Sequence, residues 1–367
     1  MFSRVFDPAV WSAVPFGFWC VVFFVLGSVV GSFLNVCIHR LPLGQSIVFP
    51  ASHCPHCQYS IPWHLNLPLI SWVHLRAKCR NCGAGISARY FVVELVTALL
   101  FLACWVVLGR PSPLVALIDA GFLAGLLAAS FIDWEHFIIP DQITIGGMVA
   151  GLVCSMLAPG LQEANSLTGA MKQSLAGMGA GAGIIYCIVR AGKWVFGRHR
   201  VALPADTRII FTESGLQWDD KQIPYEELFY RQSDVIALQA RTVELADRCY
   251  KDVAVRLSPA RLRIGNDEFD PETVPYLEAV SAEIVLPREA MGAGDVKFMG
   301  AIGAFLGWKA VLFSLMLSSM IGSVVGVTLI TLKRRSSTRL PYGPYLALAS
   351  AVWVFGGRRL VALWWQQ

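Results

Sequence analysis

The chain has 367 residues, of which 55% are hydrophobic and only 15% are charged, and its mean hydropathy is +0.56. This composition excludes a soluble enzyme, a secreted disulfide scaffold and a disordered chain, because apolar runs long enough to cross roughly 30 Å of hydrocarbon recur along it. The net charge of +5 comes without a basic cluster interleaved with aromatic residues, so we expect no nucleic-acid partner. The composition predicts an all-α polytopic protein whose surroundings are the lipid bilayer.

The apolar runs predict eight membrane-spanning helices. They are Phe16–Ile38, Tyr90–Leu108, Leu114–Ile132, Asp141–Ala158, Ser174–Arg190, Val296–Leu306, Lys309–Leu332 and Tyr342–Trp364. The sixth is short and starts beside two charged residues, so a helix that only dips into the membrane is an alternative there. The first exceeds a signal-peptide core, and no small-residue cleavage pattern follows it, so we expect it to stay uncleaved.

Charge divides the chain into a basic body and an acidic insertion. Residues 192–290 hold 17 of the 25 acidic residues but 13 of the 30 basic ones. With the amino terminus outside, thirteen Lys and Arg fall in inner loops and six in outer loops, so the positive-inside rule places residues 39–89 and 192–290 in the cytoplasm. The expected parts are a first span (1–38), a cysteine loop (39–89), spans two to five (90–191), a soluble insertion (192–290) and the last three spans (291–367).

Four of the ten cysteines form a metal-binding pattern. Cys54-Pro-His-Cys57 and Cys79-Arg-Asn-Cys82 are separated by 21 residues in a loop predicted to face a reducing compartment. Two such turns supply four thiolates for a tetrahedral zinc site that leaves no position for water, so the zinc would be structural. A loop with five prolines and little core of its own needs this stabilisation. A pair of redox dithiols and a loop without metal are the alternatives.

Acidic residues at membrane depth are costly and are therefore candidates for function. Asp133 begins Asp-Trp-Glu-His-Phe-Ile-Ile-Pro-Asp, in which Pro140 breaks the chain between two spans and leaves Asp133 and Asp141 at the predicted cytoplasmic end. Glu94 follows Arg89-Tyr90, and a local ion pair at the membrane surface is its simplest interpretation. No role follows for Asp119, which lies in the middle of a span.

The insertion shows the alternation of apolar residues that is typical of strands. We expect strands at Arg208–Phe211, Gly215–Trp218, Val235–Leu238, Val253–Leu257 and Arg261–Ile264, with turns at Asp219-Asp220 and Gly265-Asn266. Leu216–Leu228 also matches Leu262–Val274 at an offset of 46 residues, which predicts a duplicated unit of a hairpin, a turn and a helical stretch. No nucleophile, metal set or phosphate loop is evident, so a docking or gating module with an unknown partner is favoured over a second enzyme.

Asp295 closes Gly292-Ala-Gly-Asp immediately before the sixth span. Gly292 and Gly294 let backbones approach closely, and an aspartate here can simply cap the helix. Asp133 by itself can likewise be a solvated loop residue. Together, Asp133 and Asp295 form the pair that acid–base peptide hydrolysis needs, because two carboxylates a few Å apart share one proton, and one activates water while the other donates to the scissile carbonyl.

Five segments occur in a characteristic order. They are Gly31-Ser-Phe-Leu-Asn-Val-Cys-Ile-His-Arg-Leu-Pro42, the paired CxxC turns with Ser71-Trp72 and Leu75-Arg76 between them, Ile86-Ser-Ala-Arg-Tyr-Phe-Val-Val-Glu94, D-x5-IPD at Asp133–Asp141, and GxGDxK at Gly292–Lys297. In this order they resemble the type IV prepilin leader peptidases, the bacterial GxGD-type aspartic peptidases, over residues 16–191 and 290–360. Ala77, where glycine is more frequent, Phe91, where proline is, and the long insertion depart from the pattern.

The resemblance implies a membrane endopeptidase and assigns roles to particular residues. Its catalytic residues would be Asp133 and Asp295, and its substrates would be type IV prepilins or pseudopilins, cut after a glycine at the cytoplasmic face of the bacterial inner membrane. N-methylation of the new amino terminus with S-adenosylmethionine often accompanies the cleavage. The supporting residues would be Gly292, Gly294, Lys297, Pro140 and Asp141, and the zinc ligands Cys54, Cys57, Cys79 and Cys82.

A proton-coupled transporter with a metal-sensing cytoplasmic loop is the alternative function. Its intramembrane acids would relay protons. A carrier has no reason to keep both the D-x5-IPD and the GAGD motif, so the pair favours the peptidase. No glycine-rich nucleotide loop follows a strand, so a methyl donor would have to bind in a membrane-side pocket.

Overall fold

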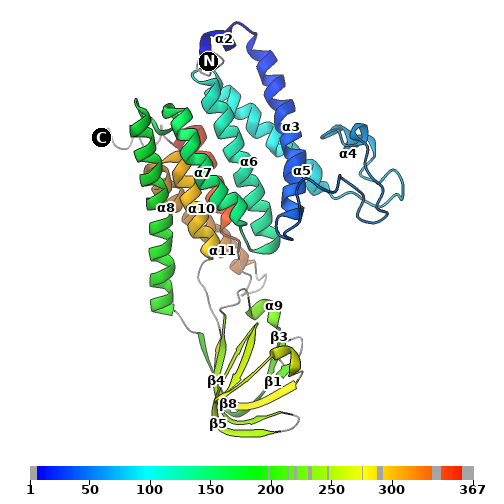
Figure 1. Ribbon diagram of the computed structural model, residues 1–367, viewed down its shortest axis with the longest axis vertical. Coiled ribbons are helices and arrows are strands. Elements are labelled where there is room, and N and C mark those ends of the chain that lie inside the picture. The colour runs from blue at the N-terminus through cyan, green and yellow to red at the C-terminus, as the bar shows by residue number, and fades with distance from the viewer. Residues whose placement is uncertain are drawn as a thin grey trace. The chain divides into compact units, whose positions relative to one another are not determined.

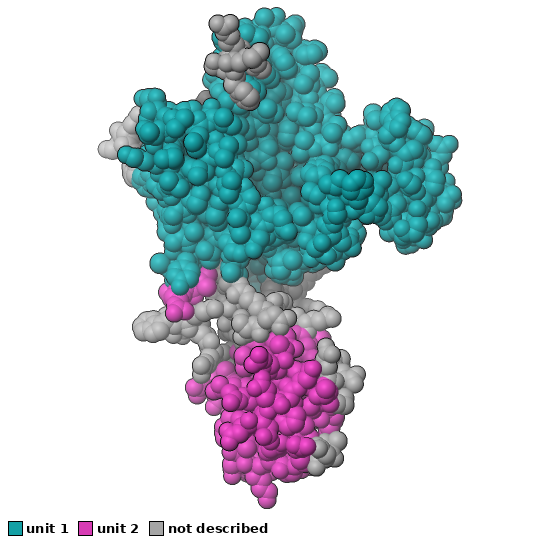
Figure 2. Space-filling model, in the orientation of Figure 1, with its two compact units in different colours: residues 1–187, 291–367 teal, residues 188–290 magenta. Residues whose placement is uncertain are grey.

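The computed structural model describes residues 6–196, 199–212, 215–218, 221–229, 234–245, 248–274, 276–286, 292–332 and 340–357. It contains two compact units, residues 1–187 with 291–367 (unit 1) and residues 188–290 (unit 2), which Figure 2 shows in teal and magenta. The predicted turn at Asp219-Asp220, the end of the last predicted span after residue 357 and the basic residues at 333–339 lie outside the described residues.

Unit 1 is a helical bundle (Figure 1). Its helices are α2 (Pro8–Ser12), α3 (Phe16–Arg40), α4 (Ile70–His74), α5 (Ala88–Cys104), α6 (Pro113–His136), α7 (Asp141–Leu157), α8 (Leu167–Phe196), α10 (Ala293–Leu306), α11 (Trp308–Thr331) and α12 (Gly343–Val352). Single π-helical turns, η2 (Trp105–Gly109) and η5 (Trp353–Gly357), extend α5 and α12, and 3-10 turns form η1 (Trp63–Leu65) and η3 (Pro159–Gln162). A helix therefore lies at each of the eight predicted span positions.

Five helices of the described chain are long and apolar enough to cross a membrane: α3, α5 with η2, α6, α8 up to Gly192, and α11. The others are shorter, with 17 residues in α7 and 14 in α10. The structure thus shows a membrane protein with a helical body, while the count of eight spanning helices is not confirmed.

Glycines bring α3 and α5 into close contact. A Cβ at Gly27 would lie 2.8 Å from Ala98 Cα, and one at Gly31 would lie 2.7 Å from Glu94 Cα. Small residues at this four-residue spacing let membrane helices approach backbone to backbone. The same device recurs in α8, where Gly177 and Gly181 face backbone carbonyls of α10.

Unit 2 contains one antiparallel eight-stranded sheet with the order β3-β2-β1-β8-β4-β5-β6-β7. Its elements are β1 (His199–Thr212), β2 (Gly215–Trp218), β3 (Lys221–Pro224), α9 (Tyr225–Leu228), β4 (Ile236–Glu244), β5 (Cys249–Ser258), β6 (Arg261–Ile264), β7 (Asp267–Phe269), η4 (Pro271–Thr273) and β8 (Tyr276–Leu286). The five expected strands fall in β1, β2, β4, β5 and β6. The second strands of the two hairpins expected within 216–228 and 262–274 are β3 and β7. Sequence reasoning missed β8.

The sheet is built from two copies of one unit. The register pair Ile209↔Trp218 in β1–β2 corresponds to Val255↔Ile264 in β5–β6, both residues shifted by 46. The hairpins β2–β3 and β6–β7 pair at the same shift, and α9 and η4 follow them. The last strand of each copy pairs with the first strand of the other, β4 with β5 and β8 with β1. The two copies are therefore interlocked and share one apolar core.

Candidate active site and metal centre

The two aspartate motifs are in direct contact at one end of unit 1. Lys297 Nζ, in the first turns of α10, lies 2.6 Å from Asp141 Oδ1 at the start of α7. A Cβ at Gly294 would lie 3.5 Å from the backbone nitrogen of Ile139. The D-x5-IPD and GxGDxK segments, which are more than 150 residues apart in the chain, therefore pack against each other.

Asp133 lies in the last turn of α6 and is 6% exposed. Its Oδ2 accepts the N–H of Gly343, the first residue of α12, at 2.8 Å. A Cβ at Gly343 would lie 2.8 Å from the same oxygen, so a side chain there would displace the carboxylate. Sequence reasoning missed Gly343, because it lies 210 residues from Asp133 and belongs to no motif that we identified.

Asp295 is the third residue of α10 and is 9% exposed. Its Oδ2 accepts the N–H of Gly292, the residue before the helix, at 3.1 Å. The N-cap is Gly292 and Asp295 is at position N3, so this bond belongs to a capping box and differs from the N-cap role that the sequence offered as an alternative. Gly292 has a φ of −75°, and a Cβ at Gly294 would make only an ordinary contact. Neither position therefore needs glycine to adopt a left-handed backbone. At position 294 there is also room for a Cβ.

Pro140 begins α7 in the expected way. It occupies the N-cap with φ −60° and ψ 144°, and its carbonyl accepts the N–H groups of Ile143 and Thr144. Phe137, with φ 55°, ends α6 by donating its N–H to the carbonyl of Asp133. The break between α6 and α7 thus consists of one left-handed residue and one proline.

The expected local ion pair between Arg89 and Glu94 does not form. Arg89 Nη1 instead lies 2.6 Å from both carboxylate oxygens of Glu135, two residues after Asp133 in α6. Glu94 Oε2 accepts the backbone N–H of Leu69 at 2.7 Å. Residues five apart on a helix point to different faces, so each of the two charges meets a different neighbour. The sequence placed Glu135 among the acidic residues at membrane depth but gave it no partner.

The two CxxC turns share one backbone geometry. In each, the carbonyl of the first cysteine accepts the N–H four residues later, and its N–H donates to the carbonyl five residues later. The equivalent residues Gln58 and Gly83 both have a positive φ, 56° and 72°. The turns form two-residue β-bridges at His53–Ser60 and Lys78–Gly85. This repetition places both cysteine pairs in the same orientation on their turns.

The four thiols converge. Their sulfur atoms all lie within 4.8 Å of one another, with Cys54 and Cys82 at 3.8 Å and Cys57 and Cys79 at 4.0 Å. A tetrahedral zinc with Zn–S bonds of about 2.3 Å separates its sulfur ligands by about 3.8 Å. The donor set and its spacing therefore fit zinc.

Asn81, between the second pair of cysteines, donates from Nδ2 to Cys57 Sγ at 3.5 Å. This hydrogen bond is the main reason that the pKa of the Cys57 thiol falls to about 6. A thiolate at neutral pH is the form that binds a metal ion. The sequence pattern gave Asn81 no role.

The cysteine loop is attached to α3 and α5 by specific contacts. Buried Arg40 donates to the carbonyls of Ser46 and Pro50. The Trp72 ring packs on Phe91, with ring centroids 5.1 Å apart. With the Leu69–Glu94 bond, these contacts join the metal centre to the helix that carries Arg89.

Comparison with known proteins identifies the family. The model of the bacterial peptidase A24 N-terminal domain matches residues 25–108, and that of the type IV leader peptidase family matches residues 120–202 and 274–327, a match interrupted by most of unit 2. A prepilin leader peptidase/N-methyltransferase of Klebsiella pneumoniae is 37% identical over 159 residues, which are 42% of this chain and 69% of that protein. The chain belongs to the type IV leader peptidase family.

Other members of the leader peptidase family extend the similarity along the chain. A prepilin leader peptidase/N-methyltransferase of Aeromonas hydrophila is 26% identical over 359 residues, 91% of this chain and 89% of that protein. One of Myxococcus xanthus is 52% identical over 133 residues, but these are only 36% of this chain and 39% of that protein. No solved structure matches the chain.

Proposed function

We propose that the chain is a membrane aspartic endopeptidase that removes the leader of type IV prepilin-like or pseudopilin substrates. Asp133 and Asp295 are its catalytic pair. The observation that carries the proposal is the contact between their two segments, made by the Lys297–Asp141 ion pair and by the packing of α10 on the start of α7. The family membership gives the same reaction class. The comparisons give no support to a proton-coupled transporter.

The proposed mechanism uses the pair as one acid–base unit. Two neighbouring carboxylates hold a single proton between them, so one takes a proton from water while the other protonates the scissile carbonyl. The Gly343 N–H holds one oxygen of Asp133, and the Gly292 N–H holds one oxygen of Asp295. Both donors are backbone N–H groups, which do not ionise. They therefore orient the carboxylates without taking part in proton transfer.

The supporting residues act on helix ends in this proposal. Lys297 and Asp141 tie α10 to α7, and both side chains are partly exposed, so their pair contributes orientation more than stability. Pro140 sets the direction of α7, Gly292 is the N-cap of α10, and Gly294 lies in the first turn of α10. Gly343, whose N–H binds Asp133 Oδ2, is a further supporting residue in this proposal.

Topology and location complete the proposal. Eight helices of unit 1, which are α3, α5, α6, α7, α8, α10, α11 and α12, would enter or cross a bacterial inner membrane, with residues 39–89, residues 192–290 and the aspartates on the cytoplasmic side. The five helices that are long enough to span, and the positive-inside pattern of the loops, support this arrangement. The division into parts at residues 38, 89, 191 and 290 belongs to the same proposal.

We also propose structural zinc on Cys54, Cys57, Cys79 and Cys82, where the ion would fix the two turns and do no chemistry. Replacement of both Cys54 and Cys79 with Ser should remove zinc from the purified protein. One equivalent that remains would contradict the assignment. Cys249→Ser, in unit 2, is the matched control and should retain the metal.

Methyl transfer from S-adenosylmethionine follows from the names of the relatives and is proposed with the cleavage. The described residues include no glycine-rich loop between a strand and a helix, so no residue is assigned to the methyl donor. Mass spectrometry of the processed pilin decides this part, since an unmodified amino terminus removes it without affecting the peptidase.

Co-expression of the full chain with the pilin-like proteins of the same genome tests the cleavage. We expect a leader-length mobility shift, and a loss of at least about 100-fold in its rate for Asp133→Asn and for Asp295→Asn. Asp7→Asn, which changes an exposed helix cap, should process normally. Normal processing by either active-site variant, at equal membrane levels, would overturn the catalytic assignment.

A further inference from the structure

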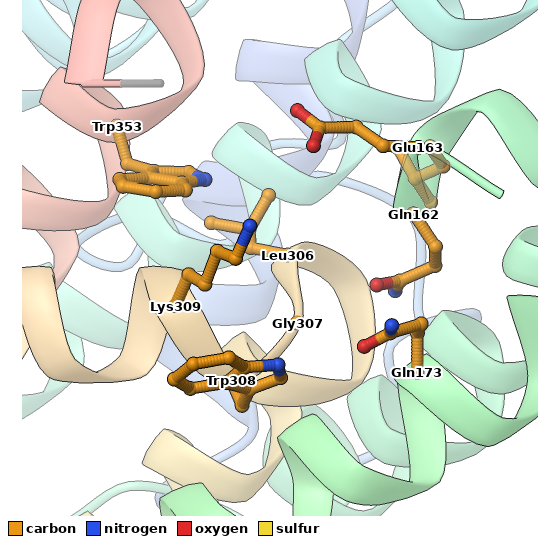
Figure 3. A pocket seen from close by; sticks show the side chains of 9 residues that line it. Gln162, Glu163, Gln173, Leu306, Gly307, Trp308, Lys309 and Trp353 are labelled. Atoms are coloured by element: carbon orange, nitrogen blue, oxygen red, sulfur yellow. The ribbon is translucent and has the colours of Figure 1, made fainter. Parts of the chain in front are cut away.

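A cavity of about 190 Å³ lies at the opposite end of α10 from Asp295. Its buried floor includes Gln162, Leu306 and Trp353, and its exposed rim includes Glu163 and Lys309. All of these residues belong to unit 1, so the fold of the helical body defines the cavity (Figure 3). Nothing in the proposed peptidase mechanism uses it.

The floor is rigid. The side-chain amide of Gln162 donates from Nε2 to the carbonyls of Ala304 and Phe305 at 2.9 and 3.0 Å and to Ser155 Oγ at 3.0 Å. These bonds tie the turn after α7 to the end of α10. Gly307, which has a φ of 81°, leaves room for Gln162 Oε1, since a Cβ there would lie 2.9 Å from that oxygen. The cavity is therefore preformed.

Trp353 presents an unsatisfied donor to this cavity. Its side chain is 4% exposed, and its indole Nε1 has no acceptor among the described residues. Figure 3 shows this nitrogen turned toward the cavity, on the side to which the Lys309 side chain reaches. A buried N–H without an acceptor is costly, so the geometry calls for an acceptor supplied by a ligand.

The rim carries one charge of each sign. Glu163, held at a φ of 55°, and Lys309 both line the cavity (Figure 3). A ligand with an anionic and a cationic group can place the first beside the ammonium group of Lys309 and the second beside the carboxylate of Glu163. Trp353 and Lys309 provide the donors on one side, and Glu163 provides the acceptor.

The cavity also lies at the start of a helix that can span a membrane. Trp308 and Lys309 are the first two residues of α11, a helix of 24 residues that is long and apolar enough to span. Trp and Lys at the end of a spanning helix are typical of the membrane–water interface. We propose that this cavity binds a phosphoethanolamine group, its phosphate on Trp353 Nε1 and Lys309 and its ammonium group on Glu163, with an aminophospholipid as the source.

Native mass spectrometry of the full chain in detergent tests this proposal. Phosphatidylethanolamine should bind about tenfold more tightly than phosphatidylcholine or phosphatidylglycerol with the same acyl chains, since neither of these offers both charged hydrogen-bonding groups. Free O-phosphoethanolamine shows whether the group comes from a lipid or from solution. If phosphatidylethanolamine binds and the free compound does not, the source is the membrane. If the two bind equally, the source is the same group in solution. Equal affinity for the three lipids would overturn the proposal.

Variants assign the contacts. Trp353→Phe keeps a ring but removes the N–H, and should weaken phosphatidylethanolamine binding about tenfold. Trp105→Phe is the matched control, because Trp105 is 3% exposed and also has an unpartnered Nε1 but does not line the cavity. Equal effects of the two variants would overturn the assignment.

The exposed rim residues provide a second route if Trp353→Phe fails to fold. Glu163→Gln should abolish the preference for ethanolamine over choline, and Lys309→Gln should weaken all three lipids. An unchanged preference in Glu163→Gln would contradict the proposal.

Discussion

The position of Asp133 depends on a residue that has no side chain. Gly343 donates its N–H to Asp133 Oδ2, and its Cα is so close that a Cβ would lie 2.8 Å from that oxygen. A methyl group at this point would have to move either the carboxylate or the start of α12. Glycine therefore matters at position 343 because a side chain there would displace Asp133 or the start of α12.

We expect Gly343→Ala to slow leader cleavage about 100-fold, because a displacement of about 1 Å in a reacting group costs this much. The rate is measured from the mobility shift of a co-expressed prepilin. Gly121→Ala, in the same helix as Asp133, is the control, since a Cβ there meets no atom within 4 Å. Equal rates in the two variants would show that Gly343 does not position Asp133.

Ala77 in the cysteine loop occupies a conformation that favours glycine, with a φ of 57°. We expect Ala77→Gly to stabilise the zinc-bound loop by about 0.5 kcal/mol, since about 1 kcal/mol of backbone strain is relieved and part of it is offset by the freer unfolded chain. The denaturant concentration that releases zinc to a metallochromic dye measures this. Ala84→Gly, at a position without positive φ, should act in the opposite direction, and a gain there equal to that of Ala77→Gly would refute the strain argument.

At the scale of the elements, α5 connects the cysteine loop to the end of α6 that carries Asp133. One of its charged residues, Glu94, holds the Leu69 N–H of the cysteine loop, and another, Arg89, pairs with Glu135 in α6. Glu135 lies two residues from Asp133. Folding of the loop by the proposed zinc and placement of the helix end that carries Asp133 would thus be joined through one helix.

Because the Arg89 and Glu135 side chains are 21% and 33% exposed, their pair contributes no more than about 1 kcal/mol. We expect Arg89→Gln and Glu135→Gln each to lower the cleavage rate severalfold, and the double variant to lose little more than either single one. Arg261→Gln, which removes an exposed ion pair in unit 2, is the control and should process normally. Additive losses would mean that the two residues act independently.

At the scale of the whole molecule, the leader peptidase body is interrupted by a duplicated sheet. The insertion begins and ends in adjacent strands, since His199 and Leu286 are register partners in β1 and β8. Its ends therefore meet, which explains how a helical body accepts about ninety residues between α8 and α10. Each copy lends its last strand to the other, so neither copy has a complete sheet without its partner.

Replacement of residues 199–286 by a short Gly/Ser linker should leave cleavage within about threefold of the full chain, because long surface insertions close with little entropy change. Immunoblots for membrane level and prepilin processing measure the outcome. Removal of the second copy alone, residues 249–286, should instead cause aggregation, since β1 loses β8, β4 loses both of its neighbours, and both strands expose sheet edges. Loss of cleavage by the linker variant at normal membrane level would show that the insertion takes part in catalysis.

Sequence reasoning succeeded where a structural signal is local. The helices of unit 1 follow from runs of apolar residues, although only five of those described are long and apolar enough to span. The two cysteine turns follow from cysteines three positions apart, and the hairpins β2–β3 and β6–β7 from alternation and a repeat of 46 residues. In each case the residues that define the feature lie within one element or one turn, so the pattern carries its own geometry. The order of the five segments added the family, which the comparisons then showed.

Tertiary structure decided which distant residues meet. The contacts of Asp133 with Gly343 and of Asp141 with Lys297 join residues 210 and 156 positions apart. Arg89 pairs with Glu135 instead of Glu94, which is nearer to it in the chain. The strand β8 was missed, although it lies between β1 and β4 and connects the two copies. Such contacts depend on how helices and strands pack, and packing across the chain leaves no periodicity in the sequence of either partner.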